Sequence, residues 1–325
     1  SLQPLGEGGQ ALHLPHATSL RMGRLGYQSD AQASLAVSYN CLDSYANSLE
    51  GALTQPYPAY EAIGIRNLGG EYNQLATTLL QIENEFYGTI RPKRVIRSGE
   101  RPLHALRERG VEYVEVRLMD LDPFEPIGLN ADTARFLDLF LLHCLLEDSP
   151  PDSPDEIAAV KNNQHLTAAR GREPGLLLQR LGQPVTLVDW AADIVGQLEP
   201  VAAAMDAQDG GRAYADALAA ARAALAAPHT LPSARVLSAM RAEHADSFSA
   251  FVSARSLDTR ARLLALPYSA DLKARFDQLA AASVAEQKRI EASDQVPFED
   301  YRREYTSPER LGTGARAVLA GAESV

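Results

Sequence analysis

Residues 75–122 read LATTLLQIENEFYGTIRPKRVIRSGERPLHALRERGVEYVEVRLMDLD, and this stretch decides the expected fold. Its last part alternates as a strand does, so Val114, Val116 and Leu118 fall on one face, which we expect to pack on a core. The opposite face carries Tyr113, Glu115 and Arg117. A carboxylate and a guanidinium then stand about 7 Å apart at the usual strand rise. That spacing suits the binding of a ligand between them, and an exposed cross-strand charge network is the alternative.

The first part of the stretch also alternates. Gln81, Glu83, Glu85 and Tyr87 share one parity, and mostly apolar residues take the other. Two polar-faced strands predict an antiparallel sheet with one packed face and one face lining a cleft. The connection between them carries four cations, which suit a compact polyanion such as a nucleoside triphosphate. A solvated charged loop explains the same residues, which are Arg91, Lys93, Arg94 and Arg97.

Composition bounds the class of protein. The chain has 325 residues, of which 46% are apolar, as expected for a globular protein of one large domain or two. A net charge of -11 argues against a nucleic-acid partner, which usually requires a positive face. We expect no membrane partner and a cytoplasmic location, because no apolar run approaches roughly 20 residues and the first residues do not resemble a signal peptide. Cys144 is expected to be a buried structural cysteine.

The fold class expected is α+β, with an active-site sheet portion over residues 1–130 and a helical region over 131–325 packed on it. Periodicity and capping signals predict a helix from Asp132, buried almost all round, and another capped by Ser153. Residues 102–109 are expected to form a short helix or turn that Gly110 ends, and the tail after Pro308 is expected to be loose. The predicted helices cover residues 34–55, 60–64, 102–109, 132–147, 153–170, 187–207, 213–226, 233–254 and 270–293.

Three ordered motifs resemble those of a known family. They are LPHATSLRMGRLGY (residues 14–27), LLQIENEFYGTIRPKRVIRSGE (79–100) and VEYVEVRLMDLDPFEPIG (111–128). Together they look like glutamate-cysteine ligase of the proteobacterial type. The resemblance implies an antiparallel sheet of the glutamine synthetase-related type. It also implies that the chain is the C-terminal portion, and that a missing N-terminal portion, a partner for this chain, supplies further strands and acidic magnesium ligands.

The family reaction consumes ATP, requires Mg²⁺ and joins the γ-carboxylate of L-glutamate to the amino group of L-cysteine, the first step of glutathione synthesis. By resemblance, Glu115 is a magnesium ligand and Arg117 contacts the transferring phosphate or the tetrahedral intermediate. Glu83 and Glu85 are weaker metal candidates, and salt bridging to the basic connection is an equal alternative for them.

The remaining assignments also follow from the resemblance. Arg21 matches the arginine that binds the glutamate carboxylate, and Tyr27 and Tyr87 match tyrosines of the cysteine pocket. The cations Arg91, Lys93 and Arg94 are expected near the ATP phosphates or at the entrance to their site. Two alternatives stay open: a related glutamate-amine ligase, and a non-catalytic interaction half of a split or nicked enzyme.

Overall fold

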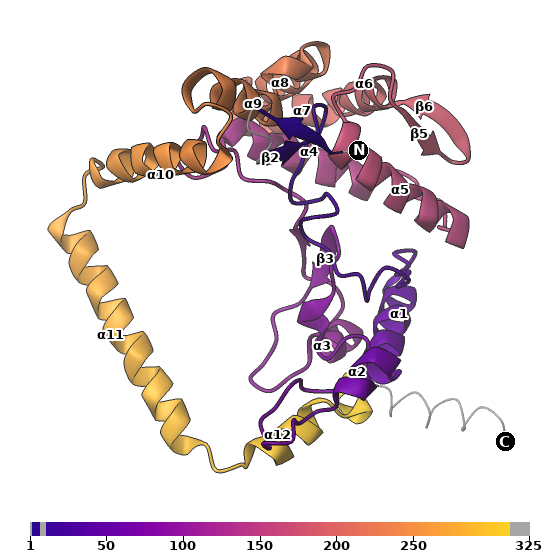
Figure 1. The fold of residues 1–325 in the computed structure, drawn as a ribbon, viewed down its shortest axis with the longest axis vertical. Coiled ribbons are helices and arrows are strands. Elements are labelled where there is room, and N and C mark those ends of the chain that lie inside the picture. Colours follow the sequence, from indigo (N-terminus) through magenta and orange to yellow (C-terminus); the bar gives the residue numbers. More distant parts are fainter. Residues whose placement is uncertain (1, 7–10, 313–325) are drawn as a thin grey trace. The chain divides into compact units, whose positions relative to one another are not determined.

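The structure is a computed structural model that describes residues 2–6 and 11–312 (Figure 1). It contains two compact units that interleave along the chain. Unit 1 holds the described residues up to 41 together with 87–90 and 116–260, and unit 2 holds 42–86, 91–115 and the described residues from 261 on. The domain division predicted at residue 130 stays a prediction.

The α+β class is confirmed, with short antiparallel strand pairs beside many helices. Strand β1 (Gln3–Leu5) pairs with β2 (Ala11–His13), and β5 (Leu177–Arg180) pairs with β6 (Gln183–Thr186). The β5–β6 hairpin closes through Leu181 and Gly182, both with positive φ, as a type I′ turn requires. Strands β3 (Ile90–Lys93) and β4 (Tyr113–Val116) also pair. Backbone hydrogen bonds at the two ends of this pair run from Glu112 N to Lys93 O and from Arg117 N to Thr89 O, both over 2.8 Å. The start of one strand therefore lies beside the end of the other, so the two strands are antiparallel.

Unit 1 is mainly helical. Leu139, Val195, Leu198, Ala202 and Leu218 form the core around which α4, α6, α7 and α8 pack (Figure 1). The helices of this unit are α4 (Ala131–Leu146), α5 (Pro154–Arg170), α6 (Leu187–Gln197), α7 (Glu199–Asp209), α8 (Ala213–Ala226), η2 (Pro228–Thr230), α9 (Pro232–Glu243) and most of α10 (Phe248–Leu264).

Unit 2 is built around α1 (Leu42–Thr54) and α3 (Pro102–Arg109), which bury Tyr45, Leu49, Leu103 and Leu106. Its other helices are α2 (Pro58–Ile63), η1 (Glu83–Glu85), α11 (Ala270–Ser293), α12 (Phe298–Tyr305) and η3 (Pro308–Leu311). Helix α11 has no buried residue among those described. None of the described helices combines the length and apolar character needed to cross a bilayer.

Several predicted helices are confirmed, including α3, α5 with its Ser153 cap, α8 and α11. Others need correction. The helix predicted from residue 34 begins at Leu42, because Ser38 and Tyr39 bond instead to the Asp152 carboxylate. The predicted helix 187–207 is broken at Leu198, just before Pro200 at the start of α7. The predicted helix 233–254 is broken where Ala245 and Asp246 adopt positive φ.

The strand predicted at residues 80–87 is wrong, because Glu83–Glu85 form a 3-10 turn. The packed face predicted for β4 is also wrong, since Val114 and Leu118 are 44% and 42% exposed. Asn130, rather than Asp132, caps α4, and Cys144 on that helix is exposed rather than buried. The β5–β6 hairpin and α12 were not predicted. The predicted loose tail includes η3, and its remainder lies outside the described residues.

Candidate active site

Four of the predicted site residues come together in unit 1. The guanidinium carbons of Arg21 and Arg117 lie 4.5 and 5.3 Å from the centroid of the Tyr27 ring. Arg21 Nε also donates to the Arg117 carbonyl over 2.6 Å. The rings of Tyr27 and Tyr87 have centroids 4.6 Å apart. Because an aromatic face attracts cations, Tyr27 holds two positive charges close together without neutralising either.

Asp120 organises the loop that carries Arg21. Its Oδ1 accepts from Arg21 N over 3.0 Å, and its Oδ2 accepts from the Ser19 hydroxyl. The Ser19 oxygen accepts in turn from Met22 N over 2.9 Å. The sequence reasoning missed this aspartate, although it lies three residues after Arg117 in the same motif. It fixes the backbone on both sides of the Arg21 side chain.

The same loop is anchored on α5 and on the turn that follows it. Thr18 N donates to Ala168 O over 2.9 Å, and its hydroxyl donates to Thr167 O over 2.7 Å. A Cβ at Gly171 would lie 2.7 Å from the Thr18 methyl carbon, so only glycine allows this approach. A helix therefore supports the loop, as a preorganised binding residue requires.

Unit 2 carries the predicted metal ligand Glu115 and the predicted phosphate-binding cations Lys93 and Arg94 on or beside its paired strands. Lys93 Nζ lies 3.5 Å from Glu115 Oε2, and Arg94 Nε lies 3.5 Å from Glu112 Oε2. The Lys93 and Glu115 side chains are 27% and 38% exposed. Both ion pairs therefore lie at a partly exposed surface, although Glu115 Oε2 itself is buried. The boundary between the units follows Glu115, so joint binding of a ligand by Glu115 and Arg117 stays a prediction.

Glu83 is held in a buried ion pair instead of on a strand face. Arg101 approaches its carboxylate with Nη2 at 2.7 Å and Nε at 2.9 Å, and Leu103 N donates to it over 3.1 Å. The two side chains are only 6% and 1% exposed. The geometry supports the ion-pair alternative for Glu83, with Arg101 in place of the basic connection. Glu85 Oε2 accepts from Gln81 N over 2.8 Å.

Arg91 also departs from the expectation of an exposed basic connection. It is 4% exposed, and its Nη2 donates to Asn84 O over 3.2 Å. Its guanidinium carbon lies 5.8 Å from the centroid of the Phe86 ring. Burial beside an aromatic ring indicates that Arg91 contributes to packing, whereas Lys93 and Arg94 lie nearer the surface.

A different group in unit 2 has metal-ligand spacing. One ligand atom each from Glu100, His104 and Glu108 lies within 4.8 Å of the others. Arg109, however, donates to both oxygens of Glu100 over 2.7 and 2.8 Å, and this pairing lowers the pKa of that carboxyl to about 2. The arginine competes with any metal ion for the carboxylate.

The chain has an α+β fold in which two arginines contact one tyrosine ring, an arrangement of charges that is able to bind a small anion. The chain belongs to the glutamate-cysteine ligase family, because the family model described as glutamate-cysteine ligase matches residues 3–167. Glutamate-cysteine ligases of Pseudomonas paraeruginosa and Azotobacter vinelandii are both 49% identical to it. The matches cover 90% and 91% of this chain but 55% and 56% of those relatives. The chain therefore spans about half their length.

Solved structures agree with this family. The glutamate-cysteine ligase of Francisella tularensis, solved in complex with AMP, is 35% identical and superposes with a TM-score of 0.83 over 90% of this chain and 57% of that one. A bifunctional glutathione synthetase of Pasteurella multocida is 20% identical, with a TM-score of 0.54 over 79% of this chain and 28% of that one, a similarity of fold alone.

Proposed function

We propose that this chain forms part of a site that ligates the γ-carboxylate of L-glutamate to the amino group of L-cysteine with ATP. The main support for this proposal is the contact among four side chains in a chain of this family. They are Arg21, Tyr27, Tyr87 and Arg117. In the proposed reaction the γ-carboxylate attacks the terminal phosphorus of ATP, giving γ-glutamyl phosphate and ADP. The cysteine amine then attacks the acyl carbon, and phosphate leaves.

The two arginines suit the charges of this reaction. Arg21 is assigned to a carboxylate of glutamate, which a planar guanidinium can bind through two parallel hydrogen bonds. Arg117 is assigned to the transferring phosphoryl group, where fixed positive charge stabilises the developing oxyanions. Their shared contact with Tyr27 supports these roles because it fixes both cations near one another.

Tyr27 and Tyr87 are assigned to the cysteine pocket. Their contacting rings offer an apolar wall for a thiol side chain, and each hydroxyl can donate or accept a hydrogen bond. Tyr87 is 43% exposed, so a small amino acid has access to it. The wall does not by itself distinguish cysteine from an amine of similar size, which keeps a related glutamate-amine ligase as an alternative.

The proposed cofactors are ATP and Mg²⁺. Glu115 is assigned as a magnesium ligand, because it is a partly exposed carboxylate and Mg²⁺ prefers oxygen ligands. Its contact with Lys93, at 3.5 Å, is longer than a typical hydrogen bond. Glu85 stays a second candidate, and Glu83 fits poorly because Arg101 and Leu103 engage its oxygens. When bound, Mg²⁺ would neutralise phosphate oxygens. The AMP complex of the Francisella relative supports nucleotide binding, for which Lys93 and Arg94 are the accessible cations.

One observation favours the second candidate function, a non-catalytic interaction half. Tyr113 and Val114 on β4 are 49% and 44% exposed. The alternation of the strand predicts that Val114 lies on a packed face. A strand pair with an uncovered apolar residue is a surface on which further strands can pack. The proposed partner is the portion that the longer relatives possess.

The test is ADP release that requires glutamate, cysteine, ATP and Mg²⁺. It is measured for the chain alone and for the chain mixed with the complementary portion of the Pseudomonas relative. Release by the chain alone would reject the interaction half, and release only on mixing would show a shared site. Arg117→Lys should lower the rate severely, while Arg135→Lys, at a partly exposed position on α4, is the matched control. Absence of release with the mixture, or equal rates for both variants, would contradict the ligase proposal.

A further inference from the structure

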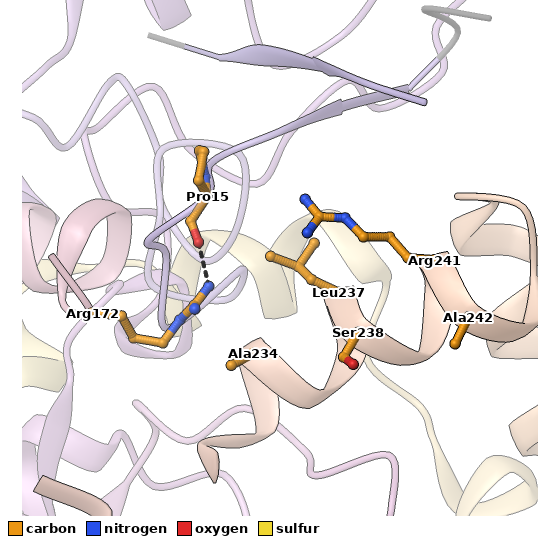
Figure 2. Close-up of a pocket in the computed structure, with 7 residues that line it drawn as sticks. All are labelled: Pro15, Arg172, Ala234, Leu237, Ser238, Arg241 and Ala242. Atoms are coloured by element: carbon orange, nitrogen blue, oxygen red, sulfur yellow. Dashed lines mark hydrogen bonds between the residues drawn. The ribbon is translucent and has the colours of Figure 1, made fainter. Parts of the chain in front are cut away.

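We infer that unit 1 has a second anion-binding site, separate from the Arg21 cluster, in the hollow between the turn after α5 and helix α9 (Figure 2). Its lining combines two arginines with a hydroxyl and small apolar groups. The lining residues are Pro15, Arg172, Ala234, Leu237, Ser238, Arg241 and Ala242. The ligand class is a small anion, a phosphate or carboxylate group on a short apolar chain.

Arg172 supplies a fixed cation. Its Nε donates to Ala17 O over 3.1 Å and its Nη2 to Pro15 O over 2.5 Å, which leaves Nη1 for another acceptor. Both acceptors are neutral carbonyls. Burial lowers the pKa of Arg172, and no carboxylate opposes that effect. An arginine nevertheless stays protonated in proteins, so the hollow contains an uncompensated positive charge.

Arg241 supplies the second cation from α9. Its side chain extends over Leu237 toward the Pro15–Arg172 hydrogen bond (Figure 2). None of the ion pairs formed by the described residues includes Arg241 or Arg172, although acids outnumber bases in the chain by 42 to 31. Two unneutralised guanidinium groups facing one hollow repel each other, and an anion between them removes that repulsion.

The rest of the lining limits the size of the ligand. Along α9, Leu237 and Ser238 each lie three or four positions from Ala234 and from Arg241, so the four residues share a helix face. The Ser238 hydroxyl can donate to the anion, and the alanine and leucine side chains can contact a short alkyl group. Because Arg172 also holds the carbonyls of the loop that leads to Arg21, an anion here would rest against the support of the proposed substrate loop.

The test is calorimetric titration of the full chain with inorganic phosphate, butyl phosphate and butyrate at low ionic strength. Arg241→Gln removes one cation from an exposed position, so the fold should be kept. We expect its affinity for the preferred probe to fall roughly tenfold or more, the usual effect of losing a charge-assisted hydrogen bond. Arg260→Gln makes the same charge change on exposed α10 and should bind as the unchanged chain does.

Three outcomes would overturn the inference. Absence of binding up to millimolar concentration of all three probes would show that the hollow is no site. Equal losses in Arg241→Gln and Arg260→Gln would show general charge attraction. Binding that disappears in Arg21→Gln but persists in Arg241→Gln would place the anion at the Arg21 cluster. Preference for butyl phosphate over butyrate, or the reverse, identifies the anionic group.

Discussion

Replacement of Glu83 by alanine should strongly destabilise unit 2. The substitution leaves the Arg101 guanidinium, whose side chain is 1% exposed, without its carboxylate partner. Two interactions would remain for Arg101: its Nη1 bond to Tyr305 O at 2.5 Å and its contact with the Tyr305 ring at 4.6 Å. Neither carries a full negative charge. The variant therefore tests whether the pair is a structural requirement of this unit.

The magnitude follows from burial. Removing one partner of a buried ion pair costs about 3–5 kcal/mol, because the remaining charge is desolvated without compensation. The loss of the Leu103 N bond to Glu83 acts in the same direction. The double variant Glu83→Leu with Arg101→Met should lose much less free energy of unfolding than Glu83→Ala does, because two apolar side chains of similar length need no charged partner.

Urea unfolding followed by far-UV circular dichroism gives the free energy of unfolding of each variant. Hydrogen exchange measured by mass spectrometry then shows which segments lose stability. Amide exchange should become faster in α3 of unit 2 and stay unchanged in α6 of unit 1. Glu286→Ala breaks an ion pair on α11 whose side chains are 67% and 52% exposed, and it should change stability by less than about 1 kcal/mol. A loss below about 1 kcal/mol for Glu83→Ala, or a double variant as unstable as the single one, would refute the reasoning.

Three further predictions concern single contacts. Leu139→Ala should lower the free energy of unfolding, measured in urea, by about 2–5 kcal/mol, because this fully buried side chain lies in the core of unit 1. A decrease of less than about 1 kcal/mol would show that Leu139 does not belong to the core. Ser153→Ala should lower the free energy of unfolding by about 1 kcal/mol and speed amide hydrogen exchange in the first turn of α5, because the Ser153 hydroxyl oxygen accepts a hydrogen bond from Glu156 N over 3.2 Å. Ser153→Asp should keep this cap and change neither quantity. Glu100 should titrate in NMR near its pKa of about 2. Because the folded value lies below the ordinary 4.5, its stabilising effect is complete above pH 4.5 and is lost as pH falls through about 2; Arg109→Gln should return the titration toward 4.5.

Local signals located most helices correctly because they act over a few residues. The proline and serine that begin α5 are adjacent in sequence, and the glycine that ends α3 follows it directly. The failures share a different cause. Residues 38–39 bond to Asp152, more than 110 positions away, and Glu83 turns inward to Arg101, 18 positions away. The alternation of apolar and polar residues within one segment gives no information about partners so distant in sequence.

By itself, the sequence determined the α+β class, the family motifs and the residue types that the chemistry needs. The resemblance of these motifs to the family implied roles for Arg21, Tyr27, Tyr87 and Arg117. The tertiary structure decided which of these residues meet, and it brought those four together in unit 1. It also assigned Glu83 to a buried ion pair, because the burial of a charge depends on which distant segment covers it. Local sequence specifies a side chain's chemistry, but folding specifies whether water, a ligand or an opposite charge surrounds it.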